Sequence, residues 1–210
     1  MCRSKAPVPA PQGTVDGEAK TQLPDVMAKQ LVGRAAFVTG AGRGIGFGIA
    51  SVLASRGASV AICDISGESA ASAAQAVVQA GWSAIALAAD VTDPGSMRRA
   101  VAATTSAFGK VDVAVANAGV IGAPGYEGRL EYSEADWDQT YVVNVIGISN
   151  TAEAVIPGMK LLGRGRIITI ASHSGRAPRG PKSRPGTVGM PYGASKAAAI
   201  QLTQIGRAHV

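Results

Sequence analysis

The sequence predicts an α/β fold in three layers, in which helices cover both faces of a doubly wound parallel sheet. Short apolar segments alternate with longer amphipathic segments along most of the chain, as expected for parallel strands joined by crossover helices. Gly57, Gly81 and Gly109 stand where these helices should end, because glycine takes the left-handed conformation there without a side-chain penalty. A glycine-rich segment also follows the first apolar segment directly. These observations indicate one domain of alternating strands and helices.

The expected elements follow one another in a regular order. Each strand is a short apolar run, and each helix is a longer segment with apolar residues at helical spacing. The five strands are expected over residues 35–39, 59–63, 84–88, 111–116 and 166–171. The helices are expected over residues 44–56, 67–80, 94–108 and 134–162, and another begins near Tyr192.

Length and composition limit the classes of protein to which the chain can belong. With 210 residues, 47% of them apolar and 16% charged, the chain can bury one substantial core. The net charge of +6 reflects a basic excess after Glu153, where no acidic residue follows. Because there is no basic stripe interleaved with aromatic residues, we expect no binding to nucleic acid. No apolar run is long enough to cross a bilayer, so we expect no membrane segment.

The N-terminal segment and the two cysteines bear on the setting of the domain. Residues 1–28 are rich in proline, glycine and polar residues without periodicity, which predicts a disordered tail before a domain that starts at residue 29. Cys2 lies in this polar tail and Cys63 in an apolar run, so they indicate neither a disulfide framework nor a metal site. We therefore expect a protein of the cytoplasm that binds no metal.

A glycine-rich motif links the first expected strand to the first expected helix. The residues TGAGRGIG occupy positions 39–46, where glycines let the backbone approach a diphosphate and the helix start offers unpaired N–H groups. A plain glycine turn is the alternative, but the strand and helix on either side favour a Rossmann-type dinucleotide site. The cofactor-binding residues expected here are Thr39, Gly40, Arg43, Gly44, Ile45 and Gly46.

The end of the second expected strand bears on the choice between NAD and NADP. Asp64 lies at the tip nearest to the adenosine ribose, where a carboxylate accepts hydrogen bonds from the ribose hydroxyls and repels a 2′-phosphate. Asp64 therefore favours NAD. Arg43, inside the glycine loop, is a cation that could meet a 2′-phosphate, which leaves NADP as the second choice.

Six motifs occur in a characteristic order along residues 31–204. After TGAGRGIG come DVTD at 90–93, NAG at 117–119, VNVIG at 143–147, IASHSG at 170–175 and YGASK at 192–196. With these motifs the chain resembles the short-chain dehydrogenase/reductase family. The resemblance implies an NAD(P)-dependent oxidoreductase that transfers a hydride between a nicotinamide cofactor and a small-molecule secondary alcohol or ketone. It also implies that the complete enzyme is a homo-oligomer.

The resemblance assigns roles to residues around the cofactor. Asn144 matches a helix asparagine whose backbone carbonyl helps to hold a water in a proton relay. Many relatives have a further asparagine where Ala116 stands, and we expect this difference to be tolerated. The residues that match an adenine contact or the turn beside the cofactor are Asp90, Val91, Asn117, Ala118 and Gly119.

Ser172, Tyr192 and Lys196 match the remaining catalytic residues of the family. The resemblance implies that Tyr192 is the general acid or base, and a phenol needs help to exchange a proton near neutral pH. Lys196 lies one helical turn away, where its ammonium and the cationic nicotinamide ring would stabilise the phenolate. Ser172 would hydrogen-bond the substrate oxygen and hold it against the phenol. Tyr192 and Lys196 are also expected to contact the cofactor.

The segment between Ser172 and Tyr192 is longer than the family usually has. It is rich in glycine, proline and cations and is expected to be a surface loop beside the mouth of the site. The cations either attract an anionic substrate or carrier, or belong to a solvated loop. They are Arg176, Arg179, Lys182 and Arg184.

The end of the chain departs from the family pattern. After Gln204 the family continues the helix and adds further strands, whereas residues 205–210 read IGRAHV, the translation of a common sequencing adapter. We therefore expect a dinucleotide-binding domain over residues 29–204 that lacks its last strands, followed by a non-native tail. The complete gene product, rather than this fragment, would then be the enzyme.

Two alternative functions stay open. An NADPH-dependent 3-oxoacyl carrier-protein reductase would share the motifs, although Asp64 disfavours it. A non-catalytic, cofactor-binding interaction protein could also use this fold, because a fold alone does not prove a function. The presence of Ser172, Tyr192 and Lys196 together argues against such a protein.

Overall fold

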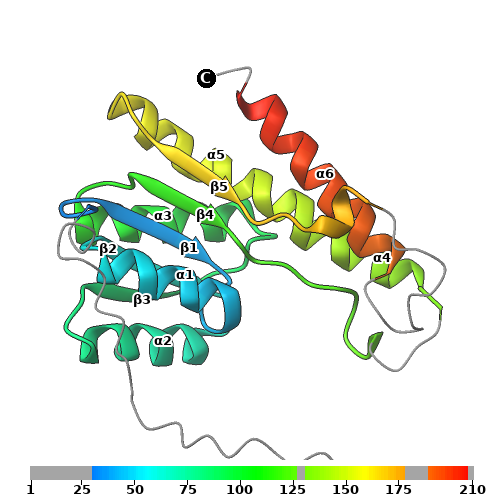
Figure 1. Ribbon diagram of the computed structural model, residues 1–210, viewed down its shortest axis with the longest axis horizontal. Coiled ribbons are helices and arrows are strands. Elements are labelled where there is room, and N and C mark those ends of the chain that lie inside the picture. The colour runs from blue at the N-terminus through cyan, green and yellow to red at the C-terminus, as the bar shows by residue number, and fades with distance from the viewer. Residues whose placement is uncertain (1–29, 127–130, 178–188, 208–210) are drawn as a thin grey trace, which may run out of the picture.

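The computed structural model describes residues 30–126, 131–177 and 189–207. These residues form a parallel sheet of five strands in the order β3-β2-β1-β4-β5, with helices on both faces (Figure 1). The strands are β1 (Ala35–Thr39), β2 (Ser59–Asp64), β3 (Ala84–Ala88), β4 (Val113–Ala116) and β5 (Arg166–Thr169). The predicted Rossmann-type α/β fold is therefore confirmed. The tail predicted over residues 1–28 lies outside the described residues.

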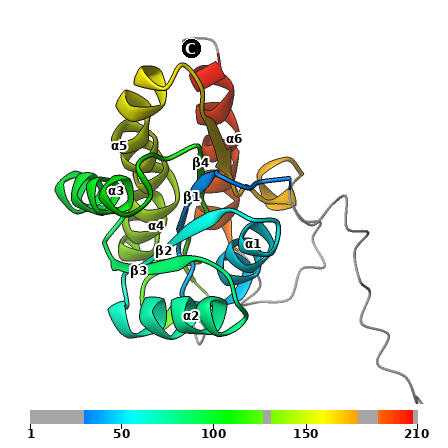
Figure 2. The same cartoon turned by 90° about the vertical axis from the view of Figure 1, so that its left-hand side faces the viewer.

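Two groups of helices cover the sheet, as the second view in Figure 2 shows. One face carries α1 (Gly44–Ser55) and α2 (Gly67–Gln79), and the other carries α3 (Pro94–Phe108) and α5 (Gly147–Leu161). The remaining elements are α4 (Glu134–Tyr141), the π-helix η2 (Val142–Ile146), the 3-10 helix η3 (His173–Gly175) and α6 (Met190–Arg207). None of the helices in the described part of the chain is long and apolar enough to span a membrane.

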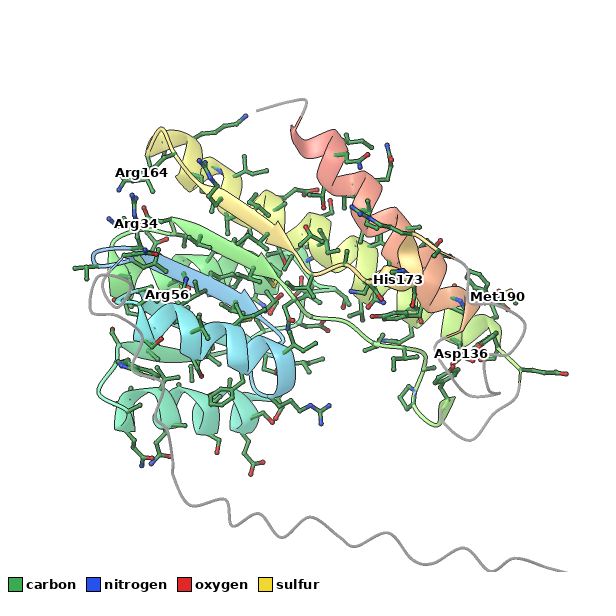
Figure 3. The ribbon with its side chains drawn as sticks, in the orientation of Figure 1. Arg34, Arg56, Asp136, Arg164, His173 and Met190 are labelled. Carbon is green, nitrogen blue, oxygen red and sulfur yellow. The ribbon has the colours of Figure 1, made fainter. Side chains whose placement is uncertain are left out.

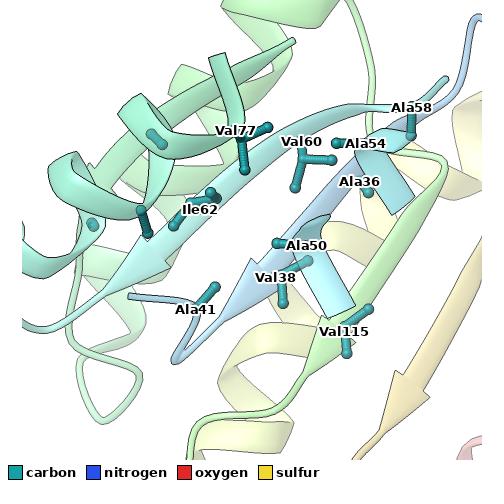
Figure 4. Packing of buried hydrophobic residues seen from close by; sticks show 13 residues of the cluster. Ala36, Val38, Ala41, Ala50, Ala54, Ala58, Val60, Ile62, Val77 and Val115 are labelled. Carbon is teal, nitrogen blue, oxygen red and sulfur yellow. The ribbon is translucent and has the colours of Figure 1, made fainter. Parts of the chain in front are cut away.

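Neighbouring residues of β1 point to opposite faces of the sheet and so anchor both helix layers. Val38 packs with Ile62 of β2 beneath Ala50 of α1 (Figure 4). Phe37 points the other way, toward Met97 of α3. All five side chains are fully buried, and each large one stabilises the fold by about 1.5–3 kcal/mol relative to exposure. This packing fixes where the strands end, and the strand ends carry the site.

The order of the strands reverses beside β1. From β1 the chain proceeds outward to β2 and β3, then crosses back through α3 to β4 and β5 on the other side of β1. The connections that leave β1 and β4 therefore diverge at the carboxyl edge of the sheet. Open α/β sheets bind their ligands in the crevice at such a point.

Several element boundaries differ from those that the sequence predicts. The helix expected over residues 134–162 is interrupted at Val142–Ile146, where the turns widen to a π-helix. β4 and β5 are shorter than expected, and α6, expected to begin near Tyr192, spans Met190–Arg207. The expected left-handed glycines are confirmed, because Gly57, Gly81 and Gly109 have φ of 95°, 86° and 77°.

A buried carboxylate ties three strands together at the amino edge of the sheet. Asp112, just before β4, is 4% exposed and accepts hydrogen bonds from Arg34 at 2.9 Å and from Arg164 at 3.1 Å. It also accepts the backbone N–H of Ala35 at 3.0 Å, and the ammonium of Lys110 lies 3.7 Å away. Figure 3 shows Arg34 and Arg164 together at this edge. The cluster joins β1, β4 and β5 on the side away from the crevice.

Candidate active site

The loop between β1 and α1 presents the start of a helix at the carboxyl edge of the sheet. Gly40 and Gly44 have φ of 61° and 58°, in the left-handed region that glycine enters without strain. A Cβ on Gly40 would lie 2.8 Å from the Cα of Ala118, and a Cβ on Gly46 would overlap the carbonyl oxygen of Gly40. Arg43 precedes the helix in an extended conformation, and its side chain makes no capping hydrogen bond. The first N–H groups of α1 thus lack a side-chain cap and suit a diphosphate.

A compact set of hydrogen bonds joins this loop to the end of β4. The amide of Asn117 donates to the carbonyl oxygens of Thr39 at 2.9 Å and Gly40 at 3.0 Å. The hydroxyl of Thr39 accepts the backbone N–H groups of Asn117 and Ala118 at 3.1 and 3.2 Å, and donates to the carbonyl of Val115 at 3.3 Å. Thr39 is buried, so its side chain supports the glycine loop from below.

Asp64 is held rigidly beside the glycine loop. Its carboxylate accepts the backbone N–H of Gly42 at 2.9 Å and that of Ser66 at 3.1 Å. The side chain is only partly buried, so lone pairs stay available to hydroxyl donors from outside. Ile45 and Arg43 are exposed nearby on the loop and first helical turn. The carboxylate therefore lies at the end of β2, directly beside the glycine loop.

The end of β3 is fixed by its own polar side chains. Asp90 accepts the backbone N–H and the hydroxyl of Thr92, both at 2.8 Å, and its own N–H donates to Ser96 at 3.1 Å. The carbonyl of Val91 accepts the amide of Asn150 in α5 at 2.8 Å. These bonds hold the segment where the resemblance places an adenine contact.

Asn144 lies in the π-helix and is fully buried. Its side chain accepts the backbone N–H of Val120 at 2.8 Å and donates to the carbonyl of Val120 at 2.9 Å. The second amide hydrogen goes to the hydroxyl of Ser195 in α6 at 3.0 Å. One side chain therefore joins the segment after β4, η2 and α6. Single π-helical turns inside α-helices occur frequently at functional sites.

Lys196 brings a buried cation to the same place. It is 4% exposed, and its ammonium donates to the carbonyl of Ile170 at 2.7 Å. Burial lowers the pKa of Lys196 below its ordinary value. Its Nζ lies 5.6 Å from the ring centroid of Tyr192, and a Cβ on Gly119 would lie 3.5 Å from it. Tyr192, Lys196 and the turn after β4 therefore converge.

Ser172 starts a short turn that packs directly on α6. Its hydroxyl accepts the backbone N–H of Ser174 at 3.2 Å, at the start of η3. A Cβ on Gly175 would lie 2.6 Å from the backbone carbon of Lys196, so only glycine permits this contact. Figure 3 shows His173, next to Ser172, on the same part of the molecule as α6 and far from the arginines of the Asp112 cluster.

The two predicted groups of residues thus share one edge of the sheet. The glycine loop and the ends of β2 and β3 carry the residues expected to bind a nucleotide, and η2, η3 and α6 carry the residues expected to be reactive. Of the cations in the long segment after Ser172, Arg176 is exposed. Arg179, Lys182 and Arg184 lie outside the described residues. Within the described part of the chain, no cluster of His, Cys, Asp or Glu could hold a metal ion.

The sequence interpretation missed two residues that shape this region. Ser195 bonds Asn144, and its only sequence signal is its place inside the YGASK motif. Asp136 is buried and accepts the backbone N–H groups of Ala123 at 2.9 Å and Ser133 at 2.8 Å. The Ser133 and Asp136 pair forms a capping box at the start of α4, a pattern that the sequence does contain.

Comparison with known proteins identifies the same family as the sequence motifs do. The model of the short chain dehydrogenase family matches residues 34–209. The 2,3-dihydro-2,3-dihydroxybenzoate dehydrogenase of Bacillus subtilis (strain 168) is 34% identical over 177 residues, which cover 84% of this chain and 64% of that protein. The sorbitol dehydrogenase of Cereibacter sphaeroides is 39% identical over 177 residues, with coverage of 83% and 64%.

Solved structures agree with the sequence relatives. A 7α-hydroxysteroid dehydrogenase complexed with NADH and 7-oxo glycochenodeoxycholic acid superimposes with a TM-score of 0.72 and 33% sequence identity, over 86% of this chain and 66% of that one. Levodione reductase superimposes with a TM-score of 0.75 and 27% identity. The chain spans less than two thirds of the length of the two sequence relatives.

Proposed function

Because the chain belongs to the short-chain dehydrogenase/reductase family, we propose that it is an oxidoreductase acting on a secondary alcohol or a ketone with a nicotinamide cofactor. The observation that carries the proposal is the position of the buried ammonium of Lys196, 5.6 Å from the ring of Tyr192 and beside Asn144. Burying a cation costs free energy. A buried lysine in such a position therefore indicates a functional site in which its charge takes part.

The glycine loop and Asp64 support a dinucleotide cofactor, with NAD preferred over NADP. Gly40 and Gly46 leave no room for a Cβ, so the backbone at the start of α1 can come close to a diphosphate. Asp64, fixed by Gly42 and Ser66, offers a carboxylate to ribose hydroxyls and repels a 2′-phosphate. When bound, the nicotinamide group supplies or accepts the hydride. The proposed dinucleotide-binding domain spans residues 29–204.

The chain's own residues handle the proton at the substrate oxygen. In this proposal Tyr192 gives the proton to a carbonyl oxygen or takes it from an alcohol. Lys196 stabilises the phenolate that forms, since its ammonium faces the ring. Ser172, held by the turn of η3, donates to the same oxygen and orients it. The side chain of Asn144 is hydrogen-bonded to Val120 and Ser195. In this proposal its backbone carbonyl is the group that holds a relay water.

An NADPH-dependent reductase of 3-oxoacyl carrier proteins is the second candidate. Arg43 favours it, because this exposed cation lies in the loop where a 2′-phosphate would come close. The carboxylate of Asp64 opposes it. Relative affinity for NADPH and NADH separates the two candidates.

The exposed face of α4 and η2 supports the proposal that the enzyme is a homo-oligomer. Apolar side chains follow this face at helical spacing, and an exposed apolar stripe of this kind marks an interaction surface. The stripe consists of Trp137, Tyr141, Val142 and Ile146, exposed by 36%, 37%, 40% and 47%. The expected setting is the cytoplasm, and the expected substrates are small alcohols or carbonyl compounds.

The proposed function is tested by turnover and cofactor binding together. NADH absorbance is followed with a panel of secondary alcohols and ketones, and NADH binding is followed by fluorescence titration. Tyr192→Phe removes the proton-transfer hydroxyl and little volume, so kcat should fall by at least about 100-fold while the Kd for NADH stays within about twofold. Tyr141→Phe, on the exposed face of α4, is the matched control. If Tyr192→Phe keeps more than about a tenth of the parent kcat, the role of Tyr192 is wrong.

A further inference from the structure

Ser195 stands between Tyr192 and Lys196 on α6 and is fully buried. Its hydroxyl donates to the carbonyl oxygen of Tyr192 at 2.8 Å and accepts the amide of Asn144 at 3.0 Å. The first bond stays within the first turns of α6, and the second reaches η2, 51 positions away in the chain. A single hydroxyl therefore connects the helix of the reactive side chains to the buried asparagine.

The hydrogen-bonding capacity of Asn144 makes this connection specific. An asparagine amide has two N–H donors, and here one goes to the carbonyl of Val120 and the other to Ser195. The amide oxygen accepts the N–H of Val120. Loss of the Ser195 hydroxyl would leave one buried N–H of Asn144 without its acceptor, which is unfavourable in the protein interior.

The turn of α6 is thus held from two directions. Lys196 reaches the carbonyl of Ile170 beyond β5 at 2.7 Å, and Ser195 reaches Asn144 in η2. Tyr192 lies near the start of the helix, where the first turn tends to fray. The Ser195 bond to the carbonyl of Tyr192 restrains this turn.

We propose that Ser195 is a positioning residue, which locks the turn carrying Tyr192 and Lys196 against Asn144. This inference rests on the proposed function, because it concerns the placement of the groups that exchange the proton. Ser195 has no open path to a ligand, since it is completely buried and its hydroxyl is bonded on both sides. Its effect on turnover therefore passes through Tyr192, Lys196 and Asn144.

Ser195→Ala tests the proposal in the 210-residue chain. A misplacement of about 1 Å can cost as much as about 100-fold in rate, so kcat should fall between about 10-fold and 100-fold. KM and the Kd for NADH should change by less than about threefold. Backbone amides of residues 192–199 should exchange with solvent faster, whereas those of α5 should keep their protection. Ser195→Thr keeps the hydroxyl and should recover most of the lost kcat.

Thr151→Val is the matched control. Thr151 is equally buried in α5, and its hydroxyl bonds only the carbonyl of Gly147 one turn back, at 2.7 Å, among the contacts of the described chain. This variant removes a buried hydroxyl of the same kind without touching the Asn144 connection. It should lower stability slightly and leave both kcat and amide exchange in α6 unchanged. Ser195→Cys, with a weaker acceptor of similar size, repeats the test if the alanine variant folds poorly.

A double-mutant cycle with Asn144→Ala completes the experiment. If Ser195 acts through Asn144, the two losses in kcat should be strongly non-additive. Additive losses, or a Ser195→Ala variant that keeps more than half of kcat with unchanged amide exchange, would show the proposal to be wrong. If the 210-residue chain neither binds NADH nor turns over an alcohol or ketone, the proposed function fails. Faster exchange confined to residues 192–199 in Ser195→Ala still decides whether Ser195 locks the turn.

Discussion

The backbone N–H of Gly42 donates to the carboxylate of Asp64 over 2.9 Å, so the glycine loop and the tip of β2 are joined by one hydrogen bond. A Cβ on Gly42 would lie 2.9 Å from this carboxylate and 2.7 Å from the Cβ of Ser69. The bond therefore exists because residue 42 has no side chain. It fixes the distance between the surfaces proposed for the diphosphate and for the ribose.

Asp64→Ala should narrow the preference for NADH over NADPH. The parent protein is expected to bind NADH more tightly, because the carboxylate accepts ribose hydroxyls and repels a 2′-phosphate. Removal of the carboxylate weakens NADH binding and relieves the repulsion. Fluorescence titration with both cofactors gives the two Kd values. A parent protein that prefers NADPH by about tenfold would contradict the assignment.

Gly42→Ala should weaken NADH binding by about tenfold or more, because the new methyl group must displace Asp64 or Ser69. Gly48→Ala, six residues further along in α1, is the matched control. Gly48 lies in α1, and a Cβ added to it would meet no atom within 4 Å, so alanine should stabilise the helix by about 0.5–1 kcal/mol without changing affinity. Equal affinities for NADH in the two variants would show that the Gly42 contact is unimportant.

Asp112→Asn should lower the free energy of unfolding by about 2–4 kcal/mol at neutral pH, because it removes a buried charge shared by Arg34 and Arg164. Urea denaturation measures the change. Asp138→Asn, on an exposed position of α4, is the control for loss of one negative charge and should have almost no effect. A loss below about 0.5 kcal/mol in Asp112→Asn would contradict the structural role of the cluster.

The same carboxylate predicts a pH dependence of stability. Burial raises the pKa of Asp112, but the N–H of Ala35 and the cations Arg34, Arg164 and Lys110 outweigh this and hold it below the ordinary value of 3.8. A lowered folded pKa means that the contribution is complete above the unfolded pKa and disappears as pH falls through the folded one. The stability difference between the parent and Asp112→Asn should therefore shrink below about pH 4. A difference that grows on acidification would be inconsistent with this sign.

Lys196→Met should abolish turnover without lowering stability. Burial lowers the pKa of Lys196 below its ordinary value, so keeping the ammonium charged in the folded state costs stability. This cost begins to decline only as pH rises through the folded pKa. Methionine has a side chain of similar length without the charge. Removing the buried charge should raise the free energy of unfolding by about 1 kcal/mol, and loss of the hydrogen bond to the carbonyl of Ile170 offsets part of this gain. Thermal unfolding at about pH 7 measures the change.

Lys160→Met is the comparison for this prediction, since Lys160 is exposed in the last turn of α5. It should change neither turnover nor stability appreciably. A Lys196→Met variant that unfolds more readily than the parent would show that the ammonium stabilises the fold, which the present interpretation does not expect.

The strands and the glycine loop could be predicted because their signals are local. Apolar runs bounded by glycine predicted β1 in full, and the left-handed φ of Gly57 and Gly109 followed from their places after helices. The substitution at Ala116 also has a simple structural account. Its side chain is 3% exposed and packs with Ile148 and Ala199, so the position is part of the core here.

The remaining features depend on contacts between distant parts of the chain. Asp112 receives partners from residues 34 and 164, which no periodic pattern relates. The hydroxyl of Ser195 meets an amide 51 positions away. The π-helix was missed because the apolar pattern of residues 134–162 reads as one continuous helix. A single wide turn alters where residues point without altering which residues are apolar.

That wide turn also determines how α4 and α5 are rotated relative to each other. A π-helical turn accommodates one residue more than an α-helical turn, so η2 absorbs an extra residue between the two helices. If residues 142–146 took α-helical geometry without losing a residue, α5 would rotate by about 100° relative to α4. Either Asn144 or the buried face with Val155 and Met159 would then point in the wrong direction. The extra residue therefore lets Asn144 reach Ser195 of α6 while Val155 and Met159 stay in the core.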